Sequence, residues 1–174
     1  MADPPPTNRV PLEVYLTTSW EPDAEYVDGV IEERPMGEWN HADWQAAVLE
    51  YFRKRRAEWN IRVAPELRVQ VSASSFRVPD VTVLDRNQPV EQIISRPPIA
   101  VIEILSPEDA IARMLKKLRE YQQMGIQTIL ILDPAGEEHY RFSAFGLTPL
   151  TETAFDLPGS SCRFDLEGIK KLLD

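Results

Sequence analysis

The sequence predicts a mixed α/β (α+β) domain in which a β-sheet is flanked by helices. Two segments, 41–59 and 109–124, carry apolar residues at spacings of three and four, which is typical of amphipathic helices. Apolar runs at 99–105 and 128–132 enclose the second helix and predict buried strands. This strand–helix–strand unit implies a parallel pair joined by a right-handed crossover.

The chain of 174 residues is expected to form one domain after a short tail. Its first ten residues, 1–10, are polar and rich in proline, which is typical of a flexible segment. Residues 11–174 show neither an internal repeat nor a second domain boundary, so we expect a single domain there. A chain of this length buries enough surface to fold without disulfides or a structural metal.

Before the first long helix, the sequence predicts a short helix and a hairpin. A proline at the first helical position favours a helix over 11–18. Asp28 and Gly29 lie between two short β-type runs and predict a tight hairpin over 25–32. Asn40 is a suitable N-cap for the long helix that follows.

The middle and end of the chain alternate between predicted strands and helices. Three β-type runs predict a meander: 61–63, 67–71 and 76–84. Gly125 is expected to end the second long helix, because glycine readily adopts the left-handed conformation found there. The run at 139–145 predicts an edge strand, and 165–173 predicts a closing helix.

Composition and motifs exclude several classes of protein. No apolar run is long enough to cross a membrane, and the first residues do not resemble a secretory signal. The single cysteine, Cys162, cannot form an internal disulfide, so a cytoplasmic location is expected. A net charge of −9 argues against a general nucleic-acid coat. The charge is unevenly distributed, however, with basic clusters at 53–56 and 113–119 and an acidic stretch at 21–33. The net charge is therefore a poor guide to what the surface can bind.

Familiar catalytic motifs are missing from the sequence. Its seven glycines form neither a dinucleotide-binding fingerprint nor a P-loop, and no serine nucleophile elbow is present. Two histidines, His41 and His139, with one cysteine cannot build a typical zinc site. The residues around Cys162 give no reason to prefer a catalytic thiol over an ordinary small residue.

Two acidic residues in apolar strands are the strongest candidates for functional residues in the sequence. Asp80 stands at the start of one predicted strand, and Glu103 lies in the middle of another. An ionised carboxylate in a buried strand is costly unless it is paired or bound to a metal. A structural ion pair with a lysine or arginine is one interpretation of Glu103. The other is a site for Mg²⁺ or Mn²⁺, which with a nearby lysine would support phosphodiester hydrolysis.

The order of these residues resembles the core of PD-(D/E)XK nucleases, in which Pro79-Asp80 precedes Glu103 on a second strand. More narrowly, the chain resembles a bacterial restriction-endonuclease-like family that expanded in cyanobacteria. The matching segments are 25–29, His41, 78–81, 101–107, 117–121, Gly125 and 132–134. The resemblance implies a restriction-endonuclease-like fold and a Mg²⁺- or Mn²⁺-dependent DNA endonuclease in which Asp80 and Glu103 bind the metal.

The sequence departs from the general nuclease pattern at the lysine. That pattern places a lysine two residues after the glutamate, where this chain has Leu105. The family resemblance implies that Lys117 on the following helix takes this role. Lys117 lies beside Met114 and Tyr121 on the predicted helix, so its stem can follow the core while its amine reaches inward. Lys116 projects farther from those two residues.

The resemblance also assigns accessory roles. Glu25 matches an N-terminal acid that assists catalysis as an outer metal ligand, against the alternative of an exposed hairpin carboxylate. His41 is a candidate for contact with the substrate, against the alternative of an ordinary satisfied histidine. Sequence recognition would lie in loops such as 86–98 and in the N-terminal hairpin. Cutting two strands favours a homodimer. A non-catalytic binding or scaffolding module with the nuclease fold is the alternative function.

Overall fold

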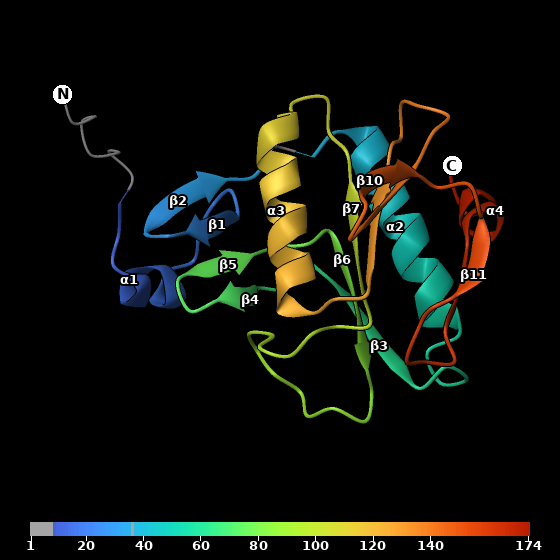
Figure 1. The fold of residues 1–174 in the computed structure, drawn as a ribbon, viewed down its shortest axis with the longest axis horizontal. Coiled ribbons are helices and arrows are strands. Elements are labelled where there is room, and N and C mark those ends of the chain that lie inside the picture. The colour runs from blue at the N-terminus through green and yellow to red at the C-terminus, as the bar shows by residue number, and fades with distance from the viewer. Residues whose placement is uncertain (1–8, 36) are drawn as a thin grey trace.

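The computed structural model describes residues 9–35 and 37–174, whose strands form two principal sheets (Figure 1). The smaller sheet is antiparallel, with the order β2 (Val30–Glu33), β1 (Ala24–Val27), β5 (Ser75–Arg77) and β4 (Val69–Ser72). Asp28 and Gly29 form its hairpin turn, and both have positive φ, as the predicted tight turn requires. The predicted hairpin is therefore present.

The larger sheet has six strands and is mixed. Its order is β10 (Gly146–Pro149), β9 (Tyr140–Ser143), β8 (Thr128–Leu132), β7 (Ala100–Ile104), β6 (Val81–Asp85) and β3 (Ile61–Pro65). Only β7 and β8 are parallel within it, and α3 (Ile111–Met124) connects them. The predicted fold class, with mixed sheets and flanking helices, is confirmed.

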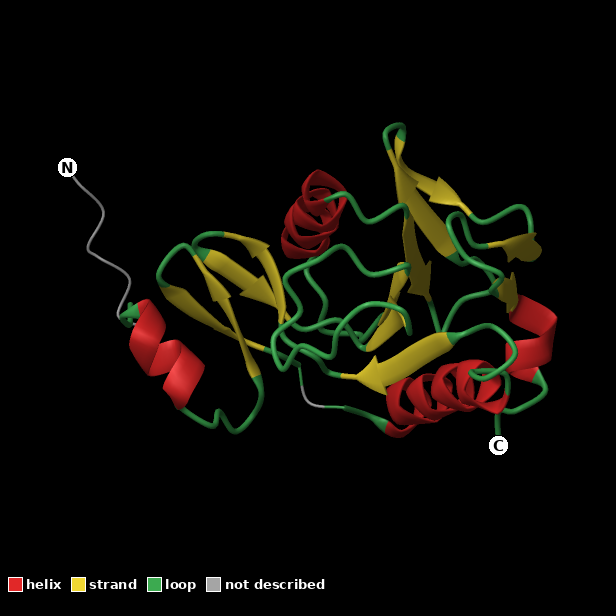
Figure 2. Cartoon of the chain, turned by 90° about the horizontal axis from the view of Figure 1, so that it is seen from below, coloured by secondary structure: helices red, strands yellow, loops and turns green. Residues whose placement is uncertain are grey.

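Helices cover both faces of the larger sheet (Figure 2). On one face lie α2 (Trp39–Lys54), α4 (Leu166–Lys170) and the ribbon of β11 (Ala154–Asp156) and β12 (Arg163–Asp165). The other face packs against α3. Side chains of β7 alternate between the two cores, so Ile102 and Ile104 meet α2 while Val101 faces α3. Glu103 faces the same side as Val101.

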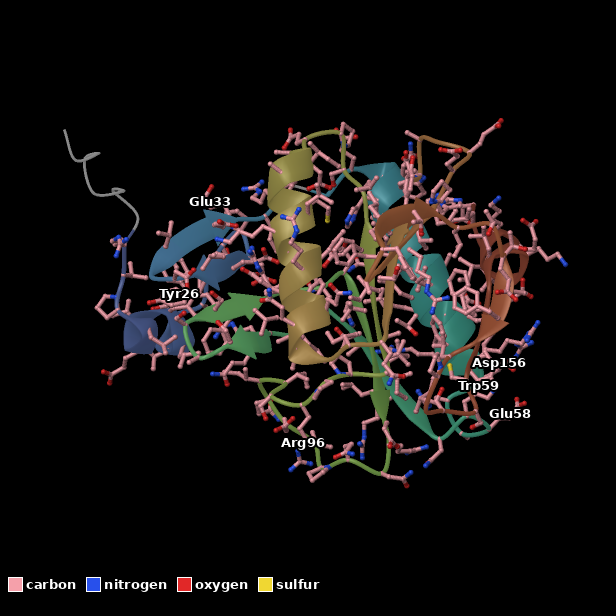
Figure 3. All side chains as sticks on the ribbon, viewed as in Figure 1. Tyr26, Glu33, Glu58, Trp59, Arg96 and Asp156 are labelled. Atoms are coloured by element: carbon pink, nitrogen blue, oxygen red, sulfur yellow. The ribbon has the colours of Figure 1, made fainter. Side chains whose placement is uncertain are left out.

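The smaller sheet has its own core against α1 (Leu12–Thr17). Tyr15 of that helix packs on Tyr26 and Phe76, and Figure 3 shows Tyr26 within this part of the molecule. Most of the expected tail, residues 1–8, lies outside the described residues, whereas Arg9 forms a β-bridge with Val30. None of the helices in the described ranges is long and apolar enough to cross a membrane.

Several sequence predictions are wrong in detail, among them the meander, because β3 and β4 lie in different sheets. The run 76–84 is two strands in different sheets, because Pro79 has no N–H with which to continue a ladder. The long helix begins at Trp39 with Glu38 at its N-cap position, so Asn40 lies inside it. The strand predicted at 139–145 is not at the edge, because β10 pairs with its outer side.

Candidate active site

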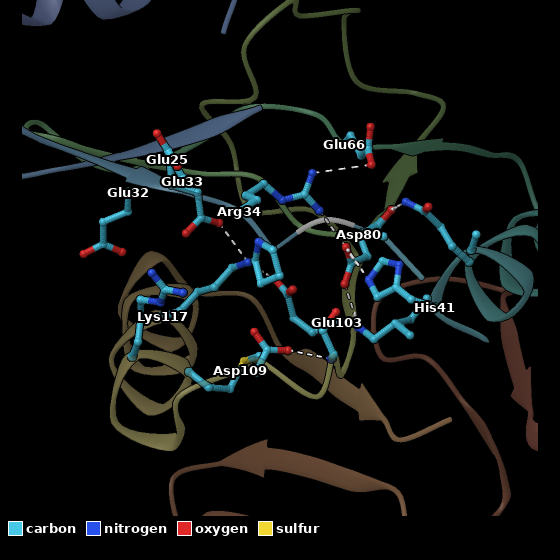
Figure 4. A pocket seen from close by; sticks show the side chains of 18 residues that line it. Glu25, Glu32, Glu33, Arg34, His41, Glu66, Asp80, Glu103, Asp109 and Lys117 are labelled. Carbon is cyan, nitrogen blue, oxygen red and sulfur yellow. Dashed lines mark hydrogen bonds and ion pairs between the residues drawn. The ribbon is translucent and has the colours of Figure 1, made fainter. Parts of the chain in front are cut away.

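The candidate site lies where the chain crosses from the smaller sheet to the larger one. After β5, the chain passes Pro79 and reaches Asp80 immediately before β6. Oδ2 of Asp80 accepts a hydrogen bond of 2.7 Å from the backbone N–H of Ile104. This bond extends the pairing of β6 with β7 and fixes the carboxylate beside the strand that carries Glu103. Figure 4 shows these side chains lining one pocket.

Lys117 projects from α3 into this pocket and bridges two carboxylates. Its Nζ lies 2.9 Å from Oε1 of Glu103 and 2.8 Å from Oε1 of Glu25. Tyr121, one helical turn later, donates a hydrogen bond of 2.6 Å to the same Glu103 oxygen. The Lys117 ammonium is buried, whereas Lys116 is exposed. The amine therefore points inward, as the helical pattern led us to expect.

The two acids on the central strands have different electrostatic environments. Burial is the main cause that raises the pKa of Glu103, to about 7. The negative charges of Asp80 and Glu25 act in the same direction, whereas the positive charge of Lys117 acts against them. Burial also acts to raise the pKa of Asp80, but a hydrogen bond from His41 and the charge of Lys117 bring it below its ordinary value. The pKa of Lys117 is raised, since the surrounding carboxylates outweigh burial. The pair thus combines a readily ionised carboxyl with one that ionises near neutrality.

Glu25 is a buried partner of two cations rather than an exposed hairpin carboxylate. Its Oε2 accepts a bond of 2.9 Å from Arg77, and its Oε1 accepts one of 3.0 Å from the backbone N–H of Val78. Burial would raise the pKa of Glu25, but Lys117, Arg77 and the hydrogen bonds lower it below the ordinary value. Glu25 therefore links the catalytic lysine candidate to the smaller sheet.

Arg34 is part of the site, and the sequence reasoning missed it. Its Nη2 donates a bond of 2.6 Å to Oδ1 of Asp80, and its Nη1 lies 3.4 Å from Glu66. His41, in the first turn of α2, places Nε2 3.3 Å from the same Asp80 oxygen, and this contact raises its pKa. Arg34 lies in the connection between β2 and α2, and no motif or spacing in the sequence distinguishes it.

The pocket between these residues is small and charged. Its volume is about 140 Å³, and its lining includes seven carboxylate side chains and three Lys or Arg side chains. A space of this size accommodates a hydrated ion and part of a polar substrate. Glu32 and Glu33 bring the N-terminal hairpin to its edge, and Arg113 brings α3 there.

The chemistry of the donors fits a hard divalent cation. Asp80 and Glu103 offer carboxylate oxygens, the ligands that Mg²⁺ and Mn²⁺ prefer, with waters completing the shell. Oε2 of Glu103 accepts no hydrogen bond from any described residue, so this oxygen is available. Among the described residues, no group of three or more His, Cys, Asp or Glu side chains is arranged to hold a metal. The two ligands expected from the sequence, Asp80 and Glu103, both line this pocket.

Cys162 is buried in the core between the larger sheet and α2, and it takes no part in this pocket. Burial raises the pKa of its thiol to about 12, so almost no thiolate is present near neutral pH. We expect the native protein to be inert toward Ellman's reagent and to release one equivalent of chromophore after unfolding in guanidinium chloride. Rapid reaction of the native protein would show that this thiol is accessible.

The mixed sheets and flanking helices are the architecture expected of a restriction-endonuclease-like fold. The comparison with protein families matches residues 12–150, and the chain belongs to the Uma2 family, described as "Putative restriction endonuclease". None of the curated proteins compared with the chain matches it.

Solved structures that resemble the chain include a nuclease-like protein and a chain of a DNA complex. The crystal structure of a "putative nuclease belonging to DUF820" from Anabaena variabilis has a TM-score of 0.78 at 21% identity, covering 95% of this chain and 99% of that one. This likeness supports the fold. A chain of the DrdV–DNA complex has a TM-score of 0.41 at 13% identity, covering 74% of this chain and 11% of that one. The second likeness is too weak to carry an argument.

Proposed function

We propose that this protein is a metal-dependent endonuclease of PD-(D/E)XK type that hydrolyses phosphodiester bonds of DNA. The observation that carries the proposal is the buried Lys117 ammonium between Glu103 and Glu25, in the pocket that also contains Asp80. A lysine and two strand-borne acids in one pocket are suited to supporting an attacking water and a developing negative charge. Membership of a family of restriction-endonuclease-like proteins supports the same conclusion.

Each side chain has a distinct task in this proposal. Asp80 and Glu103 would hold Mg²⁺ or Mn²⁺, which supplies a Lewis acid for the phosphoryl oxygen and lowers the pKa of bound water. Lys117 orients the attacking water and adds positive charge beside the reacting phosphate. Glu25 holds the Lys117 ammonium in position, or assists as an outer metal ligand. His41 lines the pocket, where it would contact the substrate.

The substrate would approach from the N-terminal hairpin side. Glu32 and Glu33 of β2 line the pocket, whereas its lining includes no residue of the 86–98 loop. Figure 3 shows Arg96 of that loop at the lower end of the molecule and Glu33 at the upper left. Of the two segments predicted to recognise DNA, the hairpin is therefore the one that lies next to the pocket. A homodimer and a cytoplasmic location stay predictions.

A non-catalytic nuclease-fold binding module is the second candidate function. Two observations favour it: the lining of the pocket has more carboxylates than cations, and Arg34 already pairs with Asp80. An excess of acid repels a polyanionic substrate unless a metal ion neutralises it. Metal binding therefore separates the two candidates.

Calorimetric titration with Mn²⁺ tests the proposed site. We expect binding by the wild type and a loss of at least about tenfold in affinity for Asp80→Ala and Glu103→Ala, because each removes a carboxylate ligand. Asp80→Asn is the second variant at that position, since it can still accept the N–H of Ile104. Glu33→Gln is the matched control, an exposed carboxylate at the edge of the same pocket.

Plasmid cleavage with and without Mn²⁺ completes the test. Metal-dependent nicking that disappears in the Asp80 and Glu103 variants supports the enzyme. Identical Mn²⁺ titrations for the wild type and all variants, together with intact plasmid, would favour the binding module.

A further inference from the structure

Both oxygens of Asp80 are already engaged by the chain's own groups. Oδ2 accepts the Ile104 N–H, whereas Oδ1 accepts the Arg34 guanidinium at 2.6 Å and lies 3.3 Å from Nε2 of His41. The Arg34 side chain is only 14% exposed, so this ion pair is shielded from solvent. A charge-assisted bond of this length is strong, and it occupies the oxygen that a metal ion would use.

A second carboxylate lies within reach of the same guanidinium. Glu66 Oε1 is 3.4 Å from Nη1 of Arg34, and its side chain is 44% exposed at the rim of the pocket. Glu66 has φ of 53°, a left-handed conformation that non-glycine residues adopt uncommonly and that is enriched at functional sites. The guanidinium therefore lies between a buried acid and an exposed one, as Figure 4 shows.

We propose that Arg34 is a resident cation on Asp80 that a divalent metal ion must displace, and that Glu66 retains the displaced guanidinium. This inference rests on the proposed metal site. The exchange leaves no buried charge unpaired, because Asp80 gains the metal ion while Arg34 remains paired with Glu66. Arg34 then stays at the rim of the pocket, where the N–H donors of its planar guanidinium are suited to a phosphodiester oxygen of the substrate.

Mn²⁺ calorimetry at constant pH and ionic strength tests this exchange. Arg34→Gln should bind Mn²⁺ about tenfold more tightly than the wild type, because a charged hydrogen bond no longer has to be broken. The Mn²⁺ affinity of Arg34→Lys should lie between those of the wild type and Arg34→Gln, since lysine keeps the positive charge but lacks the paired N–H donors of the guanidinium. Arg113→Gln is the matched control, because it removes an exposed cation from the same pocket without touching Asp80. It should change the affinity by less than about threefold.

A double-mutant cycle with Glu66 separates displacement from general charge effects. Glu66→Gln alone should weaken Mn²⁺ binding, because displaced Arg34 loses its second partner. In the Arg34→Gln background the same change should have little effect. An equal effect in both backgrounds would show that Glu66 acts only as a distant charge and would overturn the exchange.

The outcomes also separate this inference from the proposed function. If the wild type binds Mn²⁺ and Arg34→Gln binds no more tightly, the exchange is wrong and the metal site stands. If neither protein binds Mn²⁺, the metal site fails, and the exchange fails with it.

Discussion

Replacing Lys117 with methionine is expected to reduce DNA cleavage by about 100- to 1000-fold while leaving Mn²⁺ binding in place. Among the described residues, the Lys117 ammonium is the one positive group that contacts Glu103 and Glu25 together, at 2.9 and 2.8 Å. Its removal takes away charge beside the reacting phosphate but leaves the two acids that would hold the metal. A loss of rate without a loss of metal binding is therefore the signature of the proposed role.

The measurement is the initial rate of nicking of supercoiled plasmid, paired with Mn²⁺ calorimetry. Both are made well above pH 7, because the pKa of Glu103 is about 7 and the metal requires its ionised form. Lys116→Met is the matched control, since Lys116 is the neighbouring residue on α3 and is exposed. Far-ultraviolet circular dichroism verifies that each variant is folded.

Two results would contradict the role of Lys117. Full activity of Lys117→Met would remove it from catalysis. Loss of Mn²⁺ binding and of the folded state together would make Lys117 a structural residue that neutralises Glu103 and Glu25. Lys117→Arg discriminates further, because a guanidinium keeps the positive charge but cannot reproduce the position of a single ammonium.

Local sequence patterns predicted the elements around the site well. The apolar stripe of α3, ended by Gly125 with φ of 100°, and the apolar run 129–132 in β8 both depend on neighbouring residues alone. Glu103 could be identified for the same reason, because a carboxylate within an apolar strand is unusual and costly unless a cation or metal ion pairs with it. Lys117 was assigned from the family resemblance, and its position on the edge of the helical stripe was compatible with that role.

The boundary between the two sheets was beyond the reach of local patterns. The run 76–84 has β-type composition throughout, yet Arg77 pairs in the smaller sheet and Val81 in the larger one. Which partner each half selects depends on strands distant in sequence. Arg34 was missed for the related reason that its significance comes from Asp80, a residue brought close only by the fold.

The Arg77 network is the largest feature that the sequence concealed. The side chain of Arg77 is completely buried, and it pairs with Glu25 through Nη1 at 2.9 Å, with Glu32 through Nη1 at 3.0 Å and with Glu120 through Nε. These three acids come from β1, β2 and α3. The arginine thus joins the smaller sheet to the helix that carries Lys117, although each residue by itself looks like an ordinary surface charge.

Replacing Arg77 with methionine is expected to lower the free energy of unfolding by about 3–5 kcal/mol, because the change removes one of the two cations that pair with buried Glu25 and a cation partner of the half-buried Glu32 and Glu120. Urea denaturation at neutral pH measures the loss. Arg163→Met is the matched control, since Arg163 pairs with Asp156 at 2.9 Å but both side chains are at least half exposed. That substitution should cost less than about 1 kcal/mol.

The pH dependence of this loss identifies its cause. The pKa of Glu25 is lowered from 4.5 in the folded protein, so its stabilising contribution is complete above that value and disappears as the pH falls through the lowered pKa. The difference between wild type and Arg77→Met should therefore be largest near neutral pH and shrink in acid, where the carboxylates are protonated in both proteins. A difference that stays constant with pH would mean that Arg77 acts through its packing volume and not through its charge.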